Sequence, residues 1–168
     1  MKKKVIIIGC AGAGKSYFAR QLQEISGLPL YYLDCIFWKE NWTHLSREEL
    51  SKEVAMIMAQ PEWIIDGNYE NTLEARLQKA EAVYFLDIDE KICLESEAAR
   101  RGTKRPDLPE FLEEKEDPEF IEFIKAFKTD SRPYILELLE KYKDKEIHVF
   151  RTREEKEAYL EELKKELQ

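Results

Sequence analysis

Apolar residues follow two patterns along the chain. Short runs that are apolar throughout alternate with longer segments in which apolar residues lie three or four positions apart. The short runs are typical of buried strands in a parallel sheet, and the wider spacing is typical of helices with one buried face. The pattern predicts five strands, at residues 5–8, 30–33, 63–65, 82–86 and 147–150.

Capping residues indicate where several helices begin. Residues 46–49 and 152–155 are capping boxes, which predict helices from about 47 to 59 and from about 153 onward. An Asp-Pro pair at 117–118 predicts another helix start, and its helical stripe is broken or kinked before Pro133. Apolar spacing predicts three more helices, from about 15 to Gly27, around 73–80 and over 90–101.

The alternation of strands and helices predicts an α/β fold. Such chains form a parallel sheet with right-handed crossovers and helices on both faces, and ligands bind at the carboxyl ends of the strands. Four residues fall at those ends: Gly9, Asp34, Asp66 and Asp87. From 102 to 118 the helical pattern lapses, and three prolines with a cluster of Glu and Lys predict a loop or small flap over the main body.

Composition is that of a single globular domain, which we expect to span residues 1–168. The net charge of −8 argues against direct binding to nucleic acids or anionic membranes, since both need a basic face. Cys10, Cys35 and Cys93 lack the spacing of a zinc site or a disulfide framework. The first apolar run is too short for the core of a leader, and no window is apolar for long enough to span a bilayer. We therefore expect a cytoplasmic protein.

One motif in the chain is specific. Residues 9–16, Gly-Cys-Ala-Gly-Ala-Gly-Lys-Ser, match the phosphate-binding loop pattern G-x-x-x-x-G-K-[ST] directly after the first predicted strand. Glycines let successive backbone N–H groups point at phosphate oxygens, and the following helix N-terminus also favours negative charge. Lys15 would contact the β- and γ-phosphates, and the Ser16 hydroxyl would ligate Mg²⁺. The predicted nucleotide-binding residues are Gly9, Gly12, Ala13, Gly14, Lys15, Ser16 and Tyr17.

This loop, the pair Leu33-Asp34 and the segment from Trp63 to Tyr69 carry a family resemblance over nearly the whole chain. The chain resembles the small P-loop kinases related to adenylate kinase, and most of all the DNA topology modulation (FlaR-related) proteins. The resemblance implies a three-layer P-loop NTPase fold with strand order 2-3-1-4-5. It also implies ATP and Mg²⁺ as cofactors, an acceptor pocket between the second and third strands, and a mobile lid at about residues 100–132.

Arginines near the predicted flap are candidates for catalysis. Phosphoryl transfer requires positive charge around the transferred group. Arg100, Arg101, Arg105 and Arg132 flank the flap and are similar in placement to the lid arginines of these kinases. Together with Lys15, the predicted catalytic cations are Arg101, Arg105 and Arg132. The alternative is that these arginines form a solvated basic face that balances the Glu run.

The strand-end carboxylates have more than one reading. If the acceptor is a hydroxyl, as in the shikimate and gluconate kinases of the same fold, Asp34 is a candidate general base or a water-mediated partner of Mg²⁺. If the acceptor is a phosphate, Asp34 only orients substrate or metal, and a local backbone cap is the structural alternative. Asp87 ends its strand in the manner of a Walker B aspartate, which predicts a metal ligand, although such endings are common.

Acceptor binding is predicted for a further group of residues: Asp34, Trp38, Asp66, Gly67 and Asn68. Phe37, Trp38 and Trp42 are candidates for stacking on a planar acceptor or, alternatively, for ordinary packing. The segment at 66–69 suits close approach of a substrate, but a plain turn is the alternative.

The chain departs from adenylate kinase at one position. Tyr69 stands where that family typically has an arginine, so a monophosphate acceptor would need Arg47, Arg76 or the lid arginines. This departure argues against AMP as the acceptor.

The sequence therefore predicts an ATP-dependent kinase that phosphorylates a small molecule, either a nucleotide or a nucleoside-like compound. The alternative is a nucleotide-dependent regulatory or DNA-associated NTPase without a small acceptor.

Overall fold

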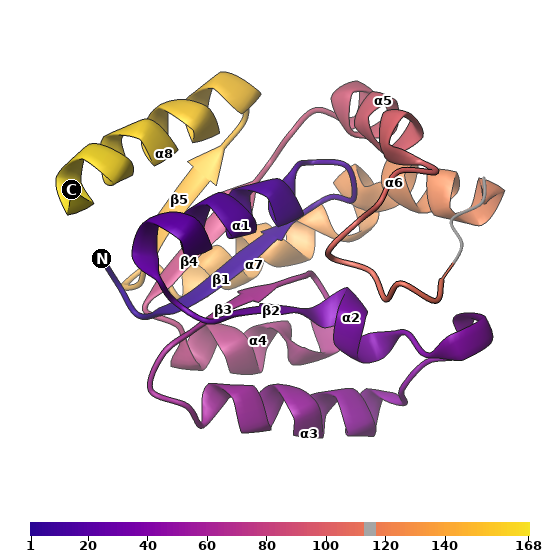
Figure 1. Ribbon diagram of the computed structural model, residues 1–168, viewed down its shortest axis with the longest axis horizontal. Helices are drawn as coiled ribbons and strands as arrows, with labels where there is room; N and C mark the ends of the chain where they lie inside the picture. The colour runs from indigo at the N-terminus through magenta and orange to yellow at the C-terminus, as the bar shows by residue number, and fades with distance from the viewer. Residues whose placement is uncertain (113–116) are drawn as a thin grey trace.

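A five-stranded parallel sheet lies at the centre of the computed structural model, which describes residues 1–112 and 117–168 (Figure 1). The strand order is β2-β3-β1-β4-β5, which confirms the predicted α/β fold and its topology. The strands are β1 (Lys4–Gly9), β2 (Leu30–Tyr32), β3 (Trp63–Asp66), β4 (Ala82–Leu86) and β5 (Glu146–Phe150).

Helices cover both faces of the sheet, as Figure 1 shows. They are α1 (Lys15–Ser26), α2 (Leu33–Phe37), α3 (Arg47–Met58), α4 (Glu70–Lys79), α5 (Glu90–Arg100), α6 (Pro118–Asp130), α7 (Arg132–Lys141) and α8 (Arg153–Leu167). One face is covered by α1 and α8, which pack on each other, and the other by α4 and α7, with α3 packed on the outside of α4. None of the helices in the described ranges is long and apolar enough to cross a membrane.

The register of the central strands brings the predicted site residues to one edge. Strand β1 is fully buried over residues 5–8 and pairs with β3 on one side and β4 on the other. Ile7 lies beside Asp66, and Gly9 lies beside Leu86. The loop after β1 therefore lies between the carboxyl ends of β3 and β4, which is where such sheets bind ligands.

The segment after β2 differs from the prediction. The strand ends at Tyr32 rather than Leu33, and a short helix, α2, follows, so that Asp34 lies in a helical turn and not at a strand end. The Trp38 N–H group donates to the Asp34 carbonyl at 3.2 Å and closes this turn. No side chain caps the start of α2 in the described structure, so the capping signal that marks other helices in the sequence is missing here.

The predicted break in the helical stripe is present, because α6 ends at Asp130 and α7 begins at Arg132. Residue 101, predicted as the end of a helix, and residues 102–112 of the predicted flap form turns and irregular structure. Residues 113–116, in the Glu-rich part of that flap, lie outside the described residues. The expectation that residues 100–132 act as a mobile lid stays a prediction.

Gly12 supplies a test of this fold. A Cβ atom at residue 12, where φ is +82°, would lie 2.1 Å from the Cys93 carbonyl oxygen on α5. We expect Gly12→Ala to lower the free energy of unfolding by about 2–4 kcal/mol, because backbone strain and overlap with α5 add together. The measurement is urea unfolding followed by circular dichroism.

Gly27 is the matched control, since φ is +74° there and a Cβ atom would meet nothing within 4 Å. Gly27→Ala should lower the free energy of unfolding by about 1 kcal/mol, the strain alone. Equal losses in the two variants would contradict the contact between Gly12 and α5.

Candidate functional site

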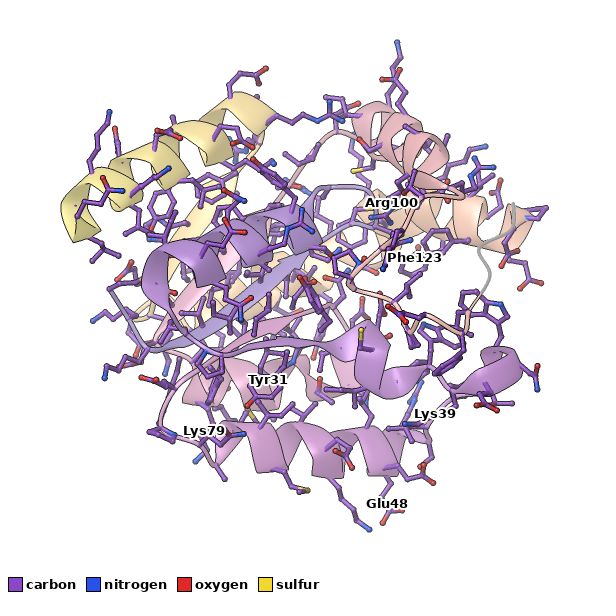
Figure 2. The ribbon with its side chains drawn as sticks, viewed as in Figure 1. Tyr31, Lys39, Glu48, Lys79, Arg100 and Phe123 are labelled. Carbon is purple, nitrogen blue, oxygen red and sulfur yellow. The ribbon has the colours of Figure 1, made fainter. Side chains whose placement is uncertain are left out.

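A cleft of 1260 Å³ opens at the carboxyl edge of the sheet. Its lining includes Lys15 and Ser16 from the phosphate-binding loop, residues of α2 and α4, and residues of α5, α6 and the 101–112 segment. Figure 2 shows Arg100 and Phe123 on the α5–α6 side of this cleft. The cleft thus joins the predicted donor and acceptor regions in one cavity.

The phosphate-binding loop has the backbone form that the motif predicts. Gly14 lies in the left-handed region, with φ +91°, and precedes the first residue of α1, Lys15. No side chain of the described residues caps the N-terminus of α1, so its first N–H groups face the loop without a side-chain acceptor. The Ala13 N–H group donates to the Cys10 carbonyl at 3.0 Å, and the Lys15 ammonium donates to the same carbonyl at 3.1 Å. This arrangement suits an anion.

Ser16 lies against Asp66. The Ser16 hydroxyl donates to Asp66 Oδ2 at 3.2 Å from the first turn of α1 to the end of β3. Asp66 is only 5% exposed, and its other oxygen, Oδ1, accepts no hydrogen bond from the described residues. Burial raises the pKa of Asp66 to about 7, although Lys15 opposes this shift. A buried carboxylate oxygen without a donor is suited to a cation.

Asp34 is held from the acceptor side. The Tyr69 hydroxyl donates a hydrogen bond to Asp34 Oδ1. Burial raises the pKa of Asp34, although this hydrogen bond and the charge of Lys15 lower it. Burial and the neighbouring Asp34 also raise the pKa of Tyr69, so the phenol remains a donor at neutral pH. Asp34, Lys15 and Tyr69 therefore form one electrostatically connected group in the cleft.

The loop after β3 ties the two regions together. Asn68 Oδ1 accepts from the Gly9 N–H group at 2.9 Å, and Asn68 Nδ2 donates to the Gly9 carbonyl at 2.6 Å. Gly67 lines the cleft, where its Cα approaches Leu33 so closely that a Cβ atom would lie 3.0 Å from Leu33 Cβ. The predicted acceptor residue Asn68 thus uses its side-chain amide to fix the start of the phosphate-binding loop.

Arg76 is buried beneath this loop with no exposed surface. Its guanidinium donates to Thr72 Oγ1 at 3.0 Å and to the Gly67 carbonyl at 2.8 Å, and it also donates to the carbonyls of Asn68 and Tyr69. Burial lowers the pKa of Arg76 to about 9. The sequence made Arg76 a candidate to bind an acceptor phosphate, but in the structure its guanidinium is buried and bonds to backbone carbonyls.

The predicted catalytic arginines occupy three different environments. Arg105 lines the cleft and is paired with the buried Asp107, with Arg105 Nη2 2.6 Å from Asp107 Oδ2. Burial would raise the pKa of Asp107, but Arg105 holds it below its ordinary value. Arg101 pairs with Glu97 at 3.4 Å, one turn earlier on α5.

Arg132 and Asp87 are paired with each other. Arg132 Nε and Nη2 each donate to one Asp87 oxygen at 2.9 Å, which is a bidentate ion pair between α7 and the end of β4. Both carboxylate oxygens of the predicted metal ligand Asp87 are therefore engaged by an arginine. The structure brings Asp66, rather than Asp87, into contact with Ser16.

Two further residues of the site were not selected from the sequence. Asp107 follows a proline in an irregular segment, and no motif marked it. Tyr69 was noted as a departure from adenylate kinase and as part of the segment at 66–69 that suits a substrate, but its hydrogen bond to Asp34 was not predicted. Tyr69 is the residue directly before α4, and its backbone is left-handed, with φ +35°. Trp38, which was predicted to bind the acceptor, does line the cleft.

Solved structures of kinases share this fold. The shikimate kinase from Bacteroides thetaiotaomicron is 17% identical, with the match covering 99% of each chain at a TM-score of 0.55. The shikimate kinase from Acinetobacter baumannii in complex with shikimate is 14% identical, with coverage of 98% of this chain and 94% of that chain at a TM-score of 0.64. The gluconokinase from Sinorhizobium meliloti 1021 is 15% identical, with coverage of 98% and 95% at a TM-score of 0.52.

These likenesses establish a P-loop kinase fold, and identities this low carry no more than the fold. No protein-family model matches the chain, and no curated protein matches it. The resemblance to the topology modulation proteins therefore stays a prediction.

Asp66→Asn should remove a pH dependence of stability. Asp66 has its pKa raised from 3.8 to about 7 in the folded protein, so the folded state binds more protons between these values. Stability is therefore lost as pH rises through this window. Relative to the unsubstituted protein, we expect the free energy of unfolding of Asp66→Asn to rise by about 2 kcal/mol between pH 5 and pH 8.

The measurement is urea unfolding at both pH values in the presence of EDTA, which removes any bound cation. Parallel pH profiles for the two proteins would contradict the buried environment of Asp66.

Proposed function

We propose that the protein transfers a phosphoryl group from ATP to a small acceptor, a nucleotide or a nucleoside-like compound, bound in the cleft. One observation carries the proposal: the phosphate-binding loop and the Asp34–Tyr69 pair open into the same cavity. An NTPase without an acceptor needs only the first of these. Support also comes from the structures that share this fold, which include shikimate kinases and a gluconokinase.

The donor would bind on the loop between β1 and α1. Its backbone N–H groups and the N-terminus of α1 would hold the phosphates, and Lys15 would leave the Cys10 carbonyl for the β- and γ-phosphates. Electrostatic stabilisation of the transferred group is usually the largest contribution to catalysis of this kind. Lys15 is therefore the first residue to which we assign a catalytic role.

Ser16 and Asp66 are the residues that would hold Mg²⁺. The buried Asp66 Oδ1 without a donor fits a cation, whereas both oxygens of Asp87 are engaged by Arg132. Mg²⁺, when bound, would neutralise charge on the donor phosphates. The described residues bring no three carboxylates, cysteines or histidines into a metal-binding group, which agrees with a cation that relies on phosphate and water for its remaining ligands.

Asp34 would act on the acceptor. If the acceptor presents a hydroxyl, its oxygen forms a bond to the γ-phosphorus, its proton passes to the Asp34 carboxylate, and the bond to the β-phosphate oxygen breaks to release ADP. Tyr69 would hold the carboxylate in place through its hydrogen bond. Arg105, although paired with Asp107, lines the cleft and is a candidate to approach the transferred group, whereas Arg101 and Arg132 are not among the described residues that line it.

Acceptor-dependent release of ADP tests the function. In a panel of nucleosides, nucleoside monophosphates and hydroxy acids with Mg²⁺ and ATP, we expect one class to raise ADP release well above the rate without acceptor. Lys15→Ala should lower the stimulated rate roughly 100-fold or more, because it removes a cation from the transferred group. Acceptor-independent hydrolysis alone would instead favour a regulatory NTPase.

The assignment of Asp66 in place of Asp87 predicts different metal responses. Asp66→Asn should raise the Mg²⁺ concentration needed for half-maximal rate roughly tenfold or more, because it removes a charged ligand. Asp87→Asn should leave this concentration unchanged and lower the melting temperature, because it removes one half of the ion pair with Arg132. If Asp87→Asn raised this Mg²⁺ concentration and Asp66→Asn did not, Asp87 would be the metal ligand.

A further inference from the structure

Aromatic side chains form a continuous wall beside Asp34. The Phe37 ring stacks on His44 at 4.8 Å and lies 4.9 Å from the Tyr69 ring, and Trp38 meets Trp42 at 5.2 Å in a T-shaped contact. Tyr69 connects this wall to the candidate base, because its hydroxyl bonds to Asp34. We call these five residues the aromatic wall.

The backbone that presents Trp42 is strained. Asn41 and Trp42 both have φ +56°, in the left-handed region, which asparagine tolerates but a bulky residue such as tryptophan rarely adopts. Each such residue costs free energy, and the surrounding bonds must enforce it. Here the Lys39 N–H group donates to the Thr43 carbonyl at 2.7 Å, across the 3-10 turn η1 (Glu40–Trp42). The Trp42 side chain that this backbone carries lines the cleft.

Aromatic residues from two other segments also line the cleft. Phe111 from the 101–112 segment is 53% exposed. Phe123 from α6 is 46% exposed (Figure 2), and Trp42 is 43% exposed. Large apolar side chains from separate segments that stay exposed in one cleft mark a binding site for an apolar group.

The charges of the cleft argue against a phosphorylated acceptor. Among the described residues that line it, six are carboxylates and four are cations. Of the cations, Lys15 belongs to the phosphate-binding loop, Arg105 is paired with Asp107, and the other two are Arg47 and Arg100. Arg76, the buried cation next to Tyr69, donates to backbone carbonyls instead of to the cleft. A phosphomonoester carries a charge of about −2 at neutral pH, for which such a lining is unfavourable.

We propose that the acceptor is an unphosphorylated, planar aromatic compound that carries a hydroxyl, a nucleoside rather than a nucleoside monophosphate. Its ring stacks on the aromatic wall at Trp42, and its hydroxyl lies at Asp34, which takes the proton as the oxygen bonds to the γ-phosphorus and ADP departs. This inference rests on the proposed kinase function and narrows its substrate class.

Calorimetric titration separates the two levels of the proposal. The probes are adenosine, guanosine, cytidine and thymidine, their 5′-monophosphates, shikimate and gluconate, each added to the full-length protein with and without Mg²⁺ and a non-hydrolysable ATP analogue. At least one nucleoside should bind roughly tenfold or more tightly than its own monophosphate. Trp42→Ala should weaken nucleoside binding roughly tenfold, the loss expected on removing one stacking partner, and leave binding of the ATP analogue unchanged.

Matched variants control the test. Trp42→Phe should restore much of the affinity, because it keeps a ring at residue 42. Met56→Ala, which removes an apolar side chain that is 67% exposed on α3, should leave all affinities unchanged. Circular dichroism of each variant reports whether it folds.

The outcomes are distinguishable. Three results would overturn the inference while leaving a kinase possible. The monophosphates could bind more tightly than the nucleosides, or no nucleoside could bind at millimolar concentration. Shikimate or gluconate could also bind with an affinity that Trp42→Ala does not change. Nucleoside binding that depends on Trp42 but never stimulates Lys15-dependent ADP release would overturn the kinase function and keep the aromatic binding site.

Discussion

The hydrogen bonds of one buried guanidinium determine the geometry of the cleft. Arg76 has no exposed surface, yet it remains largely protonated at neutral pH because its pKa falls only to about 9. A buried charge is tolerated when its donors are satisfied, and those of Arg76 bond to the carbonyls of Gly67, Asn68 and Tyr69. Asn68 in turn accepts a hydrogen bond from Gly9 at the start of the phosphate-binding loop, and Tyr69 donates a hydrogen bond to Asp34 on the other side of the cleft. A single cation therefore positions both sides of the candidate reaction.

The site is built at the expense of stability. Burial raises the pKa values of both Asp34 and Asp66, and the charge of Asp34 raises the pKa of Asp66 further. Asn41 and Trp42 add left-handed backbone to the same region. Such features are retained where function requires them, because a chain selected for stability alone would replace them with apolar or unstrained residues. These destabilising features all lie around one cleft, which independently supports the cleft as the functional site.

The fold was predictable because its signals are local, whereas much of the site depends on distant contacts. Apolar runs marked the strands, and the motif at 9–16 marked the phosphate-binding loop. The strand order of the sheet was implied by the resemblance to P-loop kinases, and the structure confirms it. Asp66 and Asp87 look alike in sequence as strand-end aspartates. Contacts distant in sequence separate them: Asp87 pairs with Arg132, 45 residues later, whereas Asp66 accepts a hydrogen bond from Ser16, 50 residues earlier. The five-residue α2 has no capping signal, and nothing in a sequence shows that Arg76 points inward.

The contact between Gly12 and the Cys93 carbonyl has a mechanical consequence. A Cβ atom at residue 12 would lie 2.1 Å from that oxygen, so no space separates the donor loop from α5. Close-packed atoms resist compression far more than separation. Helix α5 can therefore move away from the loop but cannot move closer to it. Any motion of α5 that also displaces the following 101–112 segment is limited in the same direction.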